Sequence, residues 1–417
     1  MAKTAPIPGT SDIFADEVAE WRVLEDTARS IFSRYGYGEL RTPVFERTEV
    51  FTRSLGDETD VVQKEMYSFE DRGGRNLTLR PEGTAGVMRA LVNAGIPQGD
   101  ERRVYYQGPM FRGERPAAGR KRQFHQVGVE AVGKVAAGID AECIAMLMHY
   151  MEDLEITGCK LLLNSRGSAE DRAPVAAALH DYFAAHSDEM CDDCQRRLET
   201  NVSRIMDCKT EGCRGIIDQA PGVLELLKPE SADYFAAVCA DLDRLGIAYE
   251  IDPRLVRGLD YYVHTVFEVV FDGIGAQTAL AGGGRYEITF PGQKRPVLGV
   301  GFAAGMERLL LAREACKVPA ASVDQPDVFL VSLGDDAFDA NFALAQQLRR
   351  NGLAVGMDLE RRGMKPQMRA AGKSGAPYTV IRGEQELTDG VAVVKNMETG
   401  DQQPVPVTDL AAVLSTN

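Results

Sequence analysis

Residues 106–130, YQGPMFRGERPAAGRKRQFHQVGVE, constrain the fold of this chain more than any other segment. Two strand-like stretches flank a loop that is rich in arginine and lysine. Because successive side chains of a strand point to opposite faces, Gln126, Gly128 and Glu130 share one face of the second stretch. We therefore predict a pair of strands, joined by a basic loop, that presents polar groups on one face of a sheet.

The residue types on these two strands suit the binding of a phosphorylated purine. Arg112, near the end of the first strand, can hold a phosphate through two N–H groups, and the ring of Phe124 can stack on a purine. The carboxylate of Glu130 can accept a proton from a cationic or N–H-bearing substrate. A salt-bridged hairpin without a ligand explains the same pattern, and the segment alone leaves both interpretations open.

The flanking sequence predicts an α+β region. Apolar residues at helical spacing predict a helix over residues 21–35. The alternating segment 39–51 contains Pro43, which predicts an edge or interface strand and a candidate dimer contact. Residues 76–130 follow the order strand, helix, strand, loop, strand. The β-branched and aromatic residues of 249–271 predict a hairpin of a large antiparallel sheet.

Changes of composition along the sequence divide the chain into three parts. Residues 165–245 are rich in alanine and carry four closely spaced cysteines. We predict that they form a helical insertion between 1–164 and 246–318, which together make one α+β domain. Strands and helices alternate in 326–417, after a linker that contains proline and aspartate, and this alternation predicts a separate α/β domain.

The overall charge restricts how this chain meets nucleic acid. A formal net charge of −15 argues against a protein that coats nucleic acid, since phosphate contacts need clustered lysine and arginine. Two local basic clusters remain open as RNA contacts or as solvated surface. They are Arg112, Arg115, Arg120, Lys121 and Arg122 in the loop described above, and Arg361, Arg362, Lys365, Arg369 and Lys373 near the C-terminus.

The sequence gives no sign of export or of a membrane span. The first residues lack the apolar core of a signal peptide, and no stretch approaches the ~18 apolar residues that cross a bilayer. We therefore expect a cytoplasmic protein with no membrane partner, whose eight cysteines are reduced thiols or metal ligands. Cys191, Cys194, Cys208 and Cys213 have the spacing C-x₂-C-x₁₃-C-x₄-C. Four thiolates at such spacing suit tetrahedral Zn²⁺, so a structural zinc site in the insertion is one hypothesis.

Two short motifs imitate nucleotide-binding loops. GVGFAA at residues 299–304 fits the dinucleotide fingerprint, but no βαβ unit surrounds its glycines and a linker lies where a ribose-binding acid belongs. Gly372, Lys373 and Ser374 match the end of a P-loop, but the first glycine of that motif would fall at Gln367. Neither motif supports a nucleotide-binding fold of its class.

Six segments together resemble the histidyl-tRNA synthetases, a family of class II aminoacyl-tRNA synthetases. Residues 106–130 resemble motif 2, in the form FRGERP…GRKRQFHQ. Residues 35–51, YGYGELRTPVFERTEVF, resemble motif 1, and residues 299–311, GVGFAAGMERLLL, resemble motif 3. LRPEGTA, LVRGLDYY and ALAGGGRYE resemble histidine-specific elements of the family, and all the matches occur in the family's order over nearly the whole chain.

The resemblance implies the roles of the three parts. Residues 1–164 and 246–318 would form a class II catalytic domain on a mostly antiparallel sheet, with 165–245 as the helical insertion and 326–417 as an anticodon-binding domain. The implied activity is ATP-dependent attachment of L-histidine to tRNA(His) through a histidyl-adenylate, with ATP and its Mg²⁺ counter-ion, by a homodimer. The alternative is the regulatory subunit of ATP phosphoribosyltransferase, which resembles the catalytic core but generally lacks the C-terminal domain.

The resemblance also implies a role for each residue of the candidate site. Histidine would be bound by Glu82, Gly83, Thr84, Gln126, Glu130, Tyr261 and Tyr262, with Glu130 and Tyr262 at the imidazole nitrogens. ATP would be bound by Arg112, Glu114, Phe124, Arg257 and Arg308, with Phe124 on adenine and Arg308 at the γ-phosphate. Arg112 and Arg257 would act catalytically from opposite sides of the α-phosphate. Arg120 and Arg122 would contact the tRNA.

Two departures from the family pattern fall in loops. The loop that is expected to meet the tRNA acceptor end carries Ala117, Ala118 and Lys121 in place of the usual glutamine and aromatic residue. Its way of recognising the acceptor end is therefore open. Glu287 replaces the usual aspartate after GGGRY.

Overall fold

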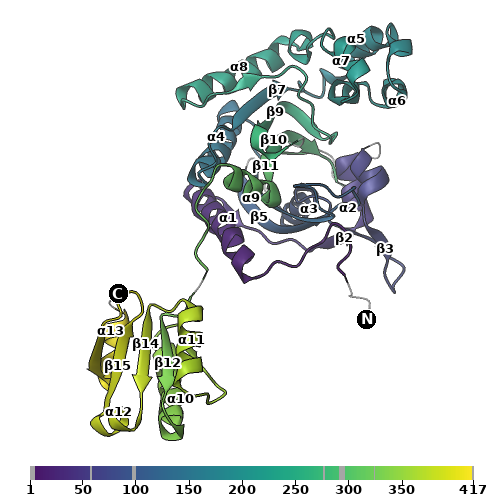
Figure 1. Cartoon of the computed structure of the whole chain (residues 1–417). Helices are drawn as coiled ribbons and strands as arrows, with labels where there is room; N and C mark the ends of the chain where they lie inside the picture. Colours follow the sequence, from purple (N-terminus) through teal and green to yellow (C-terminus); the bar gives the residue numbers. More distant parts are fainter. Residues whose placement is uncertain are drawn as a thin grey trace. The chain divides into compact units, whose positions relative to one another are not determined.

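The computed structural model describes residues 5–56, 59–95, 100–275, 278–290, 296–323 and 325–415. The chain divides into two compact units, Met1–Ala321 and Ser322–Asn417 (Figure 1). Each unit has its own sheet and its own hydrophobic core.

An eight-stranded sheet organises the first unit, in the order β1-β5-β6-β11-β10-β9-β7-β8. Its neighbours pair antiparallel except β1 with β5 and β7 with β8, so the prediction of a mostly antiparallel sheet is confirmed. The strands are β1 (Gly38–Glu39), β5 (Arg102–Phe111), β6 (Gln123–Val132), β7 (Lys160–Ser165), β8 (Glu250–Ile251), β9 (Tyr262–Val270), β10 (Ala279–Ile288) and β11 (Val297–Gly305).

Alternation along the strands gives this sheet two different faces. On β6, Val127, Val129 and Ala131 pack into the larger core, to which four helices contribute. These helices are α1 (Ala15–Arg34), α4 (Ala137–Asp153), α8 (Pro229–Arg244) and α9 (Met306–Ala315). Intervening residues such as Tyr106 and Val132 belong to the second core, which includes buried residues of α2 (Thr48–Leu55) and α3 (Thr84–Ala94). The polar positions of β6 therefore lie on the side of α2 and α3.

A small three-stranded sheet lies on the α2 and α3 side, with the order β2-β4-β3. Its strands are β2 (Phe45–Arg47), β3 (Ser68–Glu70) and β4 (Asn76–Leu79), and a π-helical turn η1 (Val61–Glu65) precedes β3. β2 and β3 are the edges of this sheet, and Val44, Phe45 and Phe69 expose 38%, 48% and 46% of their surface. An exposed apolar edge of this kind is a candidate contact surface.

The predicted order of strand, helix, strand, loop and strand over residues 76–130 is confirmed by β4, α3, β5 and β6. Two other predictions were wrong in part. The last four residues of segment 39–51 begin helix α2, because Phe51, Ser54 and Leu55 are buried at helical spacing. Residues 249–271 do not form a hairpin, because β8 pairs parallel with β7 and β7 lies between β8 and β9.

The helix predicted over residues 21–35 begins earlier, at Ala15. Asp16 and Glu17 occupy its first turn, where acidic side chains favour the positive end of the helix dipole. Its buried positions include Trp21, Leu24 and Ile31, which are the apolar positions that predicted the helix.

Residues between β7 and β8 are helical, with no strand assigned among them (Figure 1). The elements are α5 (Arg172–Ala184), η2 (Ser187–Glu189), α6 (Asp192–Thr200), η3 (Val202–Asp207), α7 (Glu211–Ile217), η4 (Val223–Leu226) and α8. Leu179, Phe183, Cys194 and Ile205 form part of a separate small core. The cysteines are thus integrated into the packing of this segment.

The second unit is a five-stranded sheet, in the order β13-β12-β14-β15-β16, packed with helices. Its elements are β12 (Val328–Ser332), α10 (Asp335–Arg350), β13 (Val355–Met357), α11 (Met364–Ser374), β14 (Tyr378–Arg382), α12 (Glu384–Asp389), β15 (Val391–Asn396), β16 (Gln402–Pro406), η6 (Val407–Asp409) and α13 (Leu410–Ser415). Alternate residues of β12 enter two cores, one shared with α10 and α13 and the other with α11. The predicted alternation of strands and helices is confirmed.

None of the helices described in either unit is long and apolar enough to cross a bilayer.

Candidate active site

The candidate site is built on β6, a central strand of the large sheet. β5 pairs antiparallel with β6, and Gly108 lies opposite Gln126. On the other side β11 pairs with β6, and Gly301 lies opposite Glu130. Gln126 and Glu130 therefore share one face, as their spacing predicted.

Glu130 lies at the buried end of this site. It is 1% exposed and accepts a hydrogen bond from Tyr286 Oη at 2.7 Å. A Cβ atom at position 301 would lie 2.1 Å from Glu130 Oε2, so the glycine on β11 leaves the space that this carboxyl group occupies. Burial raises the pKa of Glu130 to about 8, although the hydrogen bond from Tyr286 acts in the opposite direction.

Tyr261 and Tyr262 lie beside this buried end, where β9 begins. Their ring centroids are 4.6 Å apart, and the Tyr261 ring lies edge-on to Tyr286 with centroids 5.6 Å apart. Burial raises the pKa of the Tyr262 hydroxyl, so it remains a neutral hydrogen-bond donor and acceptor. Since Tyr286 contacts both Glu130 and Tyr261, the structure brings three of the predicted histidine-site residues together.

Glu82, Gly83 and Thr84 form the turn that begins α3. The two carboxylate oxygens of Glu82 accept hydrogen bonds from the backbone N–H groups of Thr84 and Ala85, both at 2.7 Å. Burial nevertheless raises the pKa of Glu82, because desolvation outweighs these two hydrogen bonds. The Tyr106 ring fills the space beside Gly83, where a Cβ would lie 2.2 Å from a ring carbon.

Unpaired polar atoms occur at the same place. Tyr106 Oη, Gln126 Oε1 and Arg257 Nε are buried and have no hydrogen-bond partner in the part of the chain that the structure describes. Buried polar atoms in folded proteins are nearly always paired, so such a cluster needs an explanation. A bound polar ligand that carries both donors and acceptors would supply the missing partners.

A basic pocket of about 350 Å³ adjoins the buried end at Glu130. Gln126 and Arg257 are among the residues that line it. Six cationic side chains and four carboxylates are among its lining residues. The cations are Arg112, Arg120, Lys121, Lys209, Arg257 and Arg308, and the carboxylates are Glu114, Asp207, Glu268 and Glu307. A cleft with surplus positive charge favours a polyanion such as a triphosphate.

Backbone contacts hold two of the predicted arginines at this pocket. Arg112 Nε donates to Pro81 O at 2.9 Å, and its guanidinium carbon lies 5.3 Å from the centroid of the Phe124 ring. Arg308 Nε and an Nη atom donate to two backbone carbonyls at 3.1 Å and 2.7 Å. Both side chains are therefore positioned before any ligand arrives.

Arg257 reaches the pocket from the loop that precedes β9. It pairs with Glu268 on β9 at 2.5 Å. A Cβ atom at position 282 would lie 2.3 Å from its guanidinium, so the glycine on β10 leaves space for this arginine. At this point of the glycine run, the space next to the backbone is therefore filled by Arg257.

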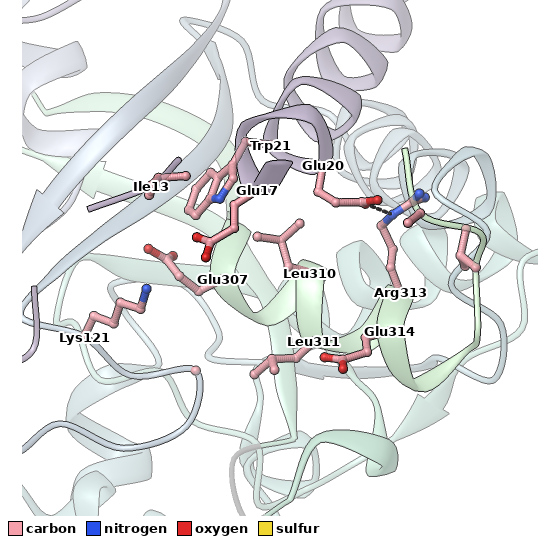
Figure 2. A pocket seen from close by; sticks show the side chains of 13 residues that line it. Ile13, Glu17, Glu20, Trp21, Lys121, Glu307, Leu310, Leu311, Arg313 and Glu314 are labelled. Atoms are coloured by element: carbon pink, nitrogen blue, oxygen red, sulfur yellow. Dashed lines mark ion pairs between the residues drawn. The ribbon is translucent and has the colours of Figure 1, made fainter. Parts of the chain in front are cut away.

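A second pocket shares Gly119, Lys121 and Glu307 with the basic pocket (Figure 2). Ile13 and Trp21 contribute from the N-terminal segment and α1, and Leu310 and Leu311 contribute from α9. Its charged lining residues are the carboxylates Glu17, Glu20, Glu307 and Glu314 and the cations Lys121 and Arg313. Because carboxylates outnumber cations here, this pocket is unsuited to a triphosphate.

The loop between β5 and β6 is closed by two backbone hydrogen bonds between Ala117 and Arg120, at 3.0 Å and 2.9 Å. The Arg120 side chain pairs with Glu114 and lines the basic pocket. Arg122 instead donates from Nε to the carbonyl of Glu114 at 3.2 Å and from its backbone N–H to Gly9 O at 2.8 Å. Arg120 is therefore placed to meet a ligand, whereas the contacts of Arg122 shape the loop.

The C-terminal basic cluster is partly neutralised by neighbouring carboxylates. Arg361 pairs with Asp335 at 3.0 Å and with Asp339 at 2.6 Å, and Arg362 pairs with Asp358 at 2.6 Å. The remaining cations, Lys365, Arg369 and Lys373, lie on α11.

The four cysteines of the insertion converge in space. The sulfur atoms of Cys191, Cys194, Cys208 and Cys213 all lie within 4.8 Å of one another, and none forms a disulfide. Cys191 Sγ and Cys208 Sγ are 3.8 Å apart. Tetrahedral zinc with Zn–S bonds of ~2.3 Å places its sulfur ligands about 3.8 Å apart, so the donor set fits such an ion.

The comparisons with known proteins agree on one family. A model described as histidyl-tRNA synthetase matches residues 9–309, and one described as an anticodon binding domain matches residues 327–417. The chain is 46% identical to the histidine–tRNA ligase of Halothermothrix orenii, over 96% of both chains, and 48% identical to that of Lysinibacillus sphaericus, over 98% of both. The crystal structure of apo S. aureus histidyl-tRNA synthetase superposes with a TM-score of 0.82 at 38% identity, covering 99% of this chain and 100% of that one.

The first unit has a mostly antiparallel sheet with the β5–loop–β6 unit and an arginine-lined pocket, and the second unit is a separate α/β domain. This combination defines a class II aminoacyl-tRNA synthetase fold. Within that class, the full-length matches decide the family. The chain belongs to the histidyl-tRNA synthetase family.

Several residues that complete the site were not singled out from the sequence. Tyr286 and Gly301 surround Glu130, Glu268 pairs with Arg257, and Lys209 reaches the basic pocket from the insertion. Tyr286 and Gly301 belong to motifs that the sequence did mark. They lie next to Glu130 because of the register in which the strands pair, and no local sequence pattern reveals that register.

Proposed function

We propose that this chain attaches histidine to its tRNA through a histidyl-adenylate that forms from histidine and ATP. The observation that carries the proposal is the junction of two subsites. A buried end with a carboxyl group and tyrosine hydroxyls meets a pocket whose lining carries six cations. An amino acid with a polar ring fits the first, and a triphosphate fits the second.

The buried end suits an imidazole ring. A neutral imidazole offers one N–H donor and one acceptor nitrogen, which Glu130 and the Tyr262 hydroxyl can satisfy. An amino acid without these groups would leave buried polar atoms unpaired, so the site discriminates against it. We assign the α-amino group to Glu82 and Thr84 in the turn before α3, and the carboxylate to the neighbourhood of Gln126.

The basic pocket suits ATP. In this assignment Phe124 stacks on adenine, Arg308 holds the γ-phosphate, and Arg112 and Arg257 approach the α-phosphate. Attack by the histidine carboxylate adds negative charge at the α-phosphate, which fixed guanidinium groups stabilise without rearrangement. Their contacts with Pro81 and Glu268 provide that fixed geometry.

The use of ATP with Mg²⁺ is general among class II synthetases. Magnesium is usually held by one or two carboxylates together with substrate phosphates. Glu114 and Glu268 line the basic pocket and fit that description. Mg²⁺ would neutralise phosphate charge there and orient the leaving pyrophosphate.

We assign the tRNA to two regions. Arg120 lines the basic pocket and would meet the acceptor end, with Arg122 supporting the loop. The second unit would bind the anticodon, in keeping with the model that matches residues 327–417. Residues 165–245 would be an insertion within the catalytic domain, and residues 326–417 the separate anticodon-binding domain.

Two structural features belong to the same proposal. The four cysteines of the insertion would hold a structural zinc ion, because their sulfur atoms converge within 4.8 Å of one another. The chain would act as a homodimer through the motif 1 region, where Phe45 of the edge strand β2 and the preceding Val44 are exposed.

The regulatory-subunit alternative has less support. The structure whose title combines an ATP phosphoribosyltransferase regulatory subunit with histidyl-tRNA synthetase, from Bacillus halodurans C, is 19% identical to this chain, which shows a shared fold alone. Relatives at 46–48% identity over nearly the whole chain are named histidine–tRNA ligases. Arg112, Arg257 and Arg308 are also all present at the basic pocket.

The test is histidine-dependent exchange of pyrophosphate into ATP. Wild type should catalyse it, and Arg257→Ala should lower kcat/KM by about 10²–10³, the usual cost of removing one donor that stabilises a developing oxyanion. Arg254→Ala is the matched control, because Arg254 belongs to the same loop, is exposed and pairs with Asp218 at 2.6 Å. Folded wild-type protein that shows no histidine-dependent exchange would contradict the proposal and favour a non-catalytic role.

A further inference from the structure

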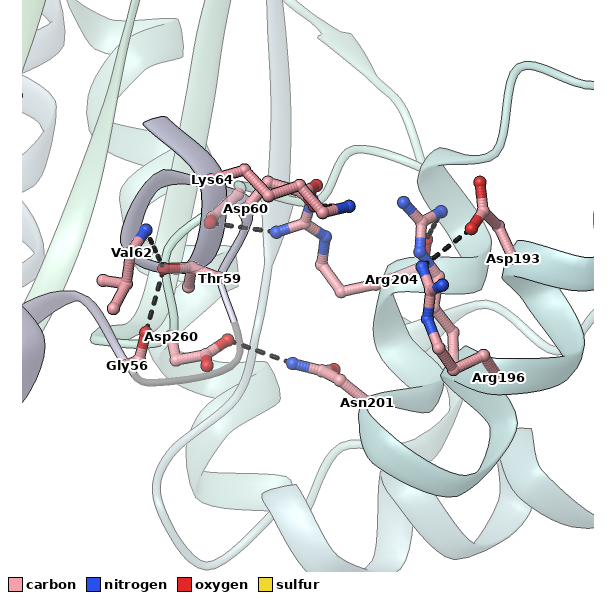
Figure 3. A network of polar contacts seen from close by, with 12 residues as sticks. Gly56, Thr59, Asp60, Val62, Lys64, Asp193, Arg196, Asn201, Arg204 and Asp260 are labelled. Atoms are coloured by element: carbon pink, nitrogen blue, oxygen red, sulfur yellow. Dashed lines mark hydrogen bonds and ion pairs between the residues drawn. The ribbon is translucent and has the colours of Figure 1, made fainter. Parts of the chain in front are cut away.

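Hydrogen bonds join the insertion to the loop that carries Arg257. Figure 3 shows the one between Asn201 and Asp260. Asn201 Nδ2 donates to Asp260 Oδ1 at 3.1 Å, and Arg204 donates to the carbonyl of Gly258 at 3.0 Å. A second Arg204 nitrogen contacts Asp60 Oδ2 at 3.3 Å, which adds the turn after α2 to the network. These contacts fix the start of η3 against the catalytic part of the same unit.

The chain after this attachment runs along the basic pocket. Asp207, at the end of η3, and Lys209, two residues later, are exposed and line the pocket together with Arg257 and Arg308. Lys209 makes no ion pair and no side-chain hydrogen bond with any residue that the structure describes. Its ammonium group is therefore available to a ligand.

Cys208 fixes the backbone between these two side chains. Its backbone N–H donates to Ile205 O at 2.9 Å, and its sulfur accepts the Thr210 N–H at 3.5 Å. The same sulfur lies 3.8 Å from Cys191 Sγ in the cysteine cluster. The backbone at Lys209 is thus held by the attachment at Asn201 and Arg204 and by the cysteine cluster at Cys208, whose sulfur also binds the N–H of Thr210.

We propose that Lys209 is a nucleotide-binding residue that the insertion contributes to the ATP site, where its ammonium group binds a phosphate oxygen of the triphosphate. The proposal rests on the assignment of the basic pocket to ATP. Lysine binds phosphate as a point charge from a flexible stem, so an exposed side chain on a fixed backbone can reach the ligand without a rearrangement of the fold. The insertion then takes part in adenylate formation in addition to any contact with tRNA.

The experiment compares Lys209→Ala, Lys209→Arg and Lys228→Ala in histidine-dependent pyrophosphate exchange, with ATP and histidine varied separately. Loss of one hydrogen bond to a charged group corresponds to about a 10- to 100-fold rise in KM for ATP in Lys209→Ala, while KM for histidine stays within about twofold. Lys209→Arg should return the KM for ATP most of the way to the wild-type value. Lys228 is the control, because it belongs to the insertion and pairs with exposed Glu170 at 2.7 Å.

Calorimetric titration with a non-hydrolysable ATP analogue supplies a readout independent of turnover, and Lys209→Ala should weaken binding by a similar factor. An unchanged KM for ATP in Lys209→Ala, or an equal rise in Lys228→Ala, would overturn the proposal. In aminoacylation of tRNA, a rise confined to the KM for tRNA would also overturn it and assign Lys209 to the acceptor end. If wild type shows no exchange at all, the proposed function fails, and the titration still decides whether Lys209 binds the nucleotide.

Discussion

Replacement of Glu130 by glutamine should remove part of the pH dependence of the free energy of unfolding of the first unit. Burial raises the pKa of this carboxyl group from its ordinary value of 4.5 to about 8. A raised pKa means that the folded chain binds a proton that the unfolded chain releases more easily. The contribution to stability is therefore complete below pH 4.5 and is lost as the pH rises toward about 8.

The size of the effect follows from these two pKa values. Between pH 6 and pH 8 the linkage relation gives a loss of about 2 kcal/mol in the free energy of unfolding of wild type. Glutamine keeps the acceptor oxygen for Tyr286 Oη but does not titrate. From pH 6 to pH 8, the free energy of unfolding of Glu130→Gln should therefore rise by about 2 kcal/mol relative to that of wild type.

The measurement is urea denaturation at pH 6, 7 and 8, followed by tryptophan fluorescence. Trp21 is the single tryptophan of the chain and is buried in the first unit, so its signal reports on that unit. Glu199→Gln, on an exposed position of α6, controls for the removal of one negative charge from a chain of net charge −15. If the difference in free energy of unfolding between Glu130→Gln and wild type stayed constant from pH 6 to pH 8, the reasoning about this buried carboxyl group would be refuted.

Two further predictions concern assembly and metal. Phe45→Asp should convert the dimer to a monomer at micromolar concentration, because it places a charge on the exposed edge strand β2; sedimentation of wild type as a monomer would contradict the dimer. Protein purified under reducing conditions should contain one zinc per chain, and Cys208→Ser should lose it and unfold at a lower temperature. Elemental analysis that finds no zinc in wild type would exclude the metal. Cys239→Ser is the control for melting, because it makes the same change at a half-buried cysteine of the insertion outside the cluster.

The fold could be predicted wherever hydrophobic periodicity is long or a strand is buried. The correct predictions were helix α1, the order of elements from β4 to β6 and the alternation of strands and helices in the second unit. The prediction was wrong at 249–271 because β8 has two residues and pairs with β7, whereas a sequence pattern shows strand propensity without showing the neighbour. Residues 48–51 alternate like a strand, yet burial of Phe51 and Leu55 against α3 makes them helical.

The site could be predicted where its residues belong to recognisable motifs, and the structure brings Arg112, Arg257 and Arg308 to one pocket. The roles assigned to individual residues remain proposals. Lys209 could not be found in the same way, because it lies in a segment without a recognisable nucleotide motif. Its place at the pocket depends on long-range contacts such as Asn201 with Asp260.

The central position of β6 has a consequence for synthesis of the chain. Its partner β11 begins at Val297, some 165 residues after β6 ends at Val132. At ~5–20 residues per second, a ribosome needs about 10–30 s to make the intervening segment. Throughout that interval the nascent β5–β6 pair exposes an apolar strand edge, so we expect chaperones to recognise this chain until β11 emerges.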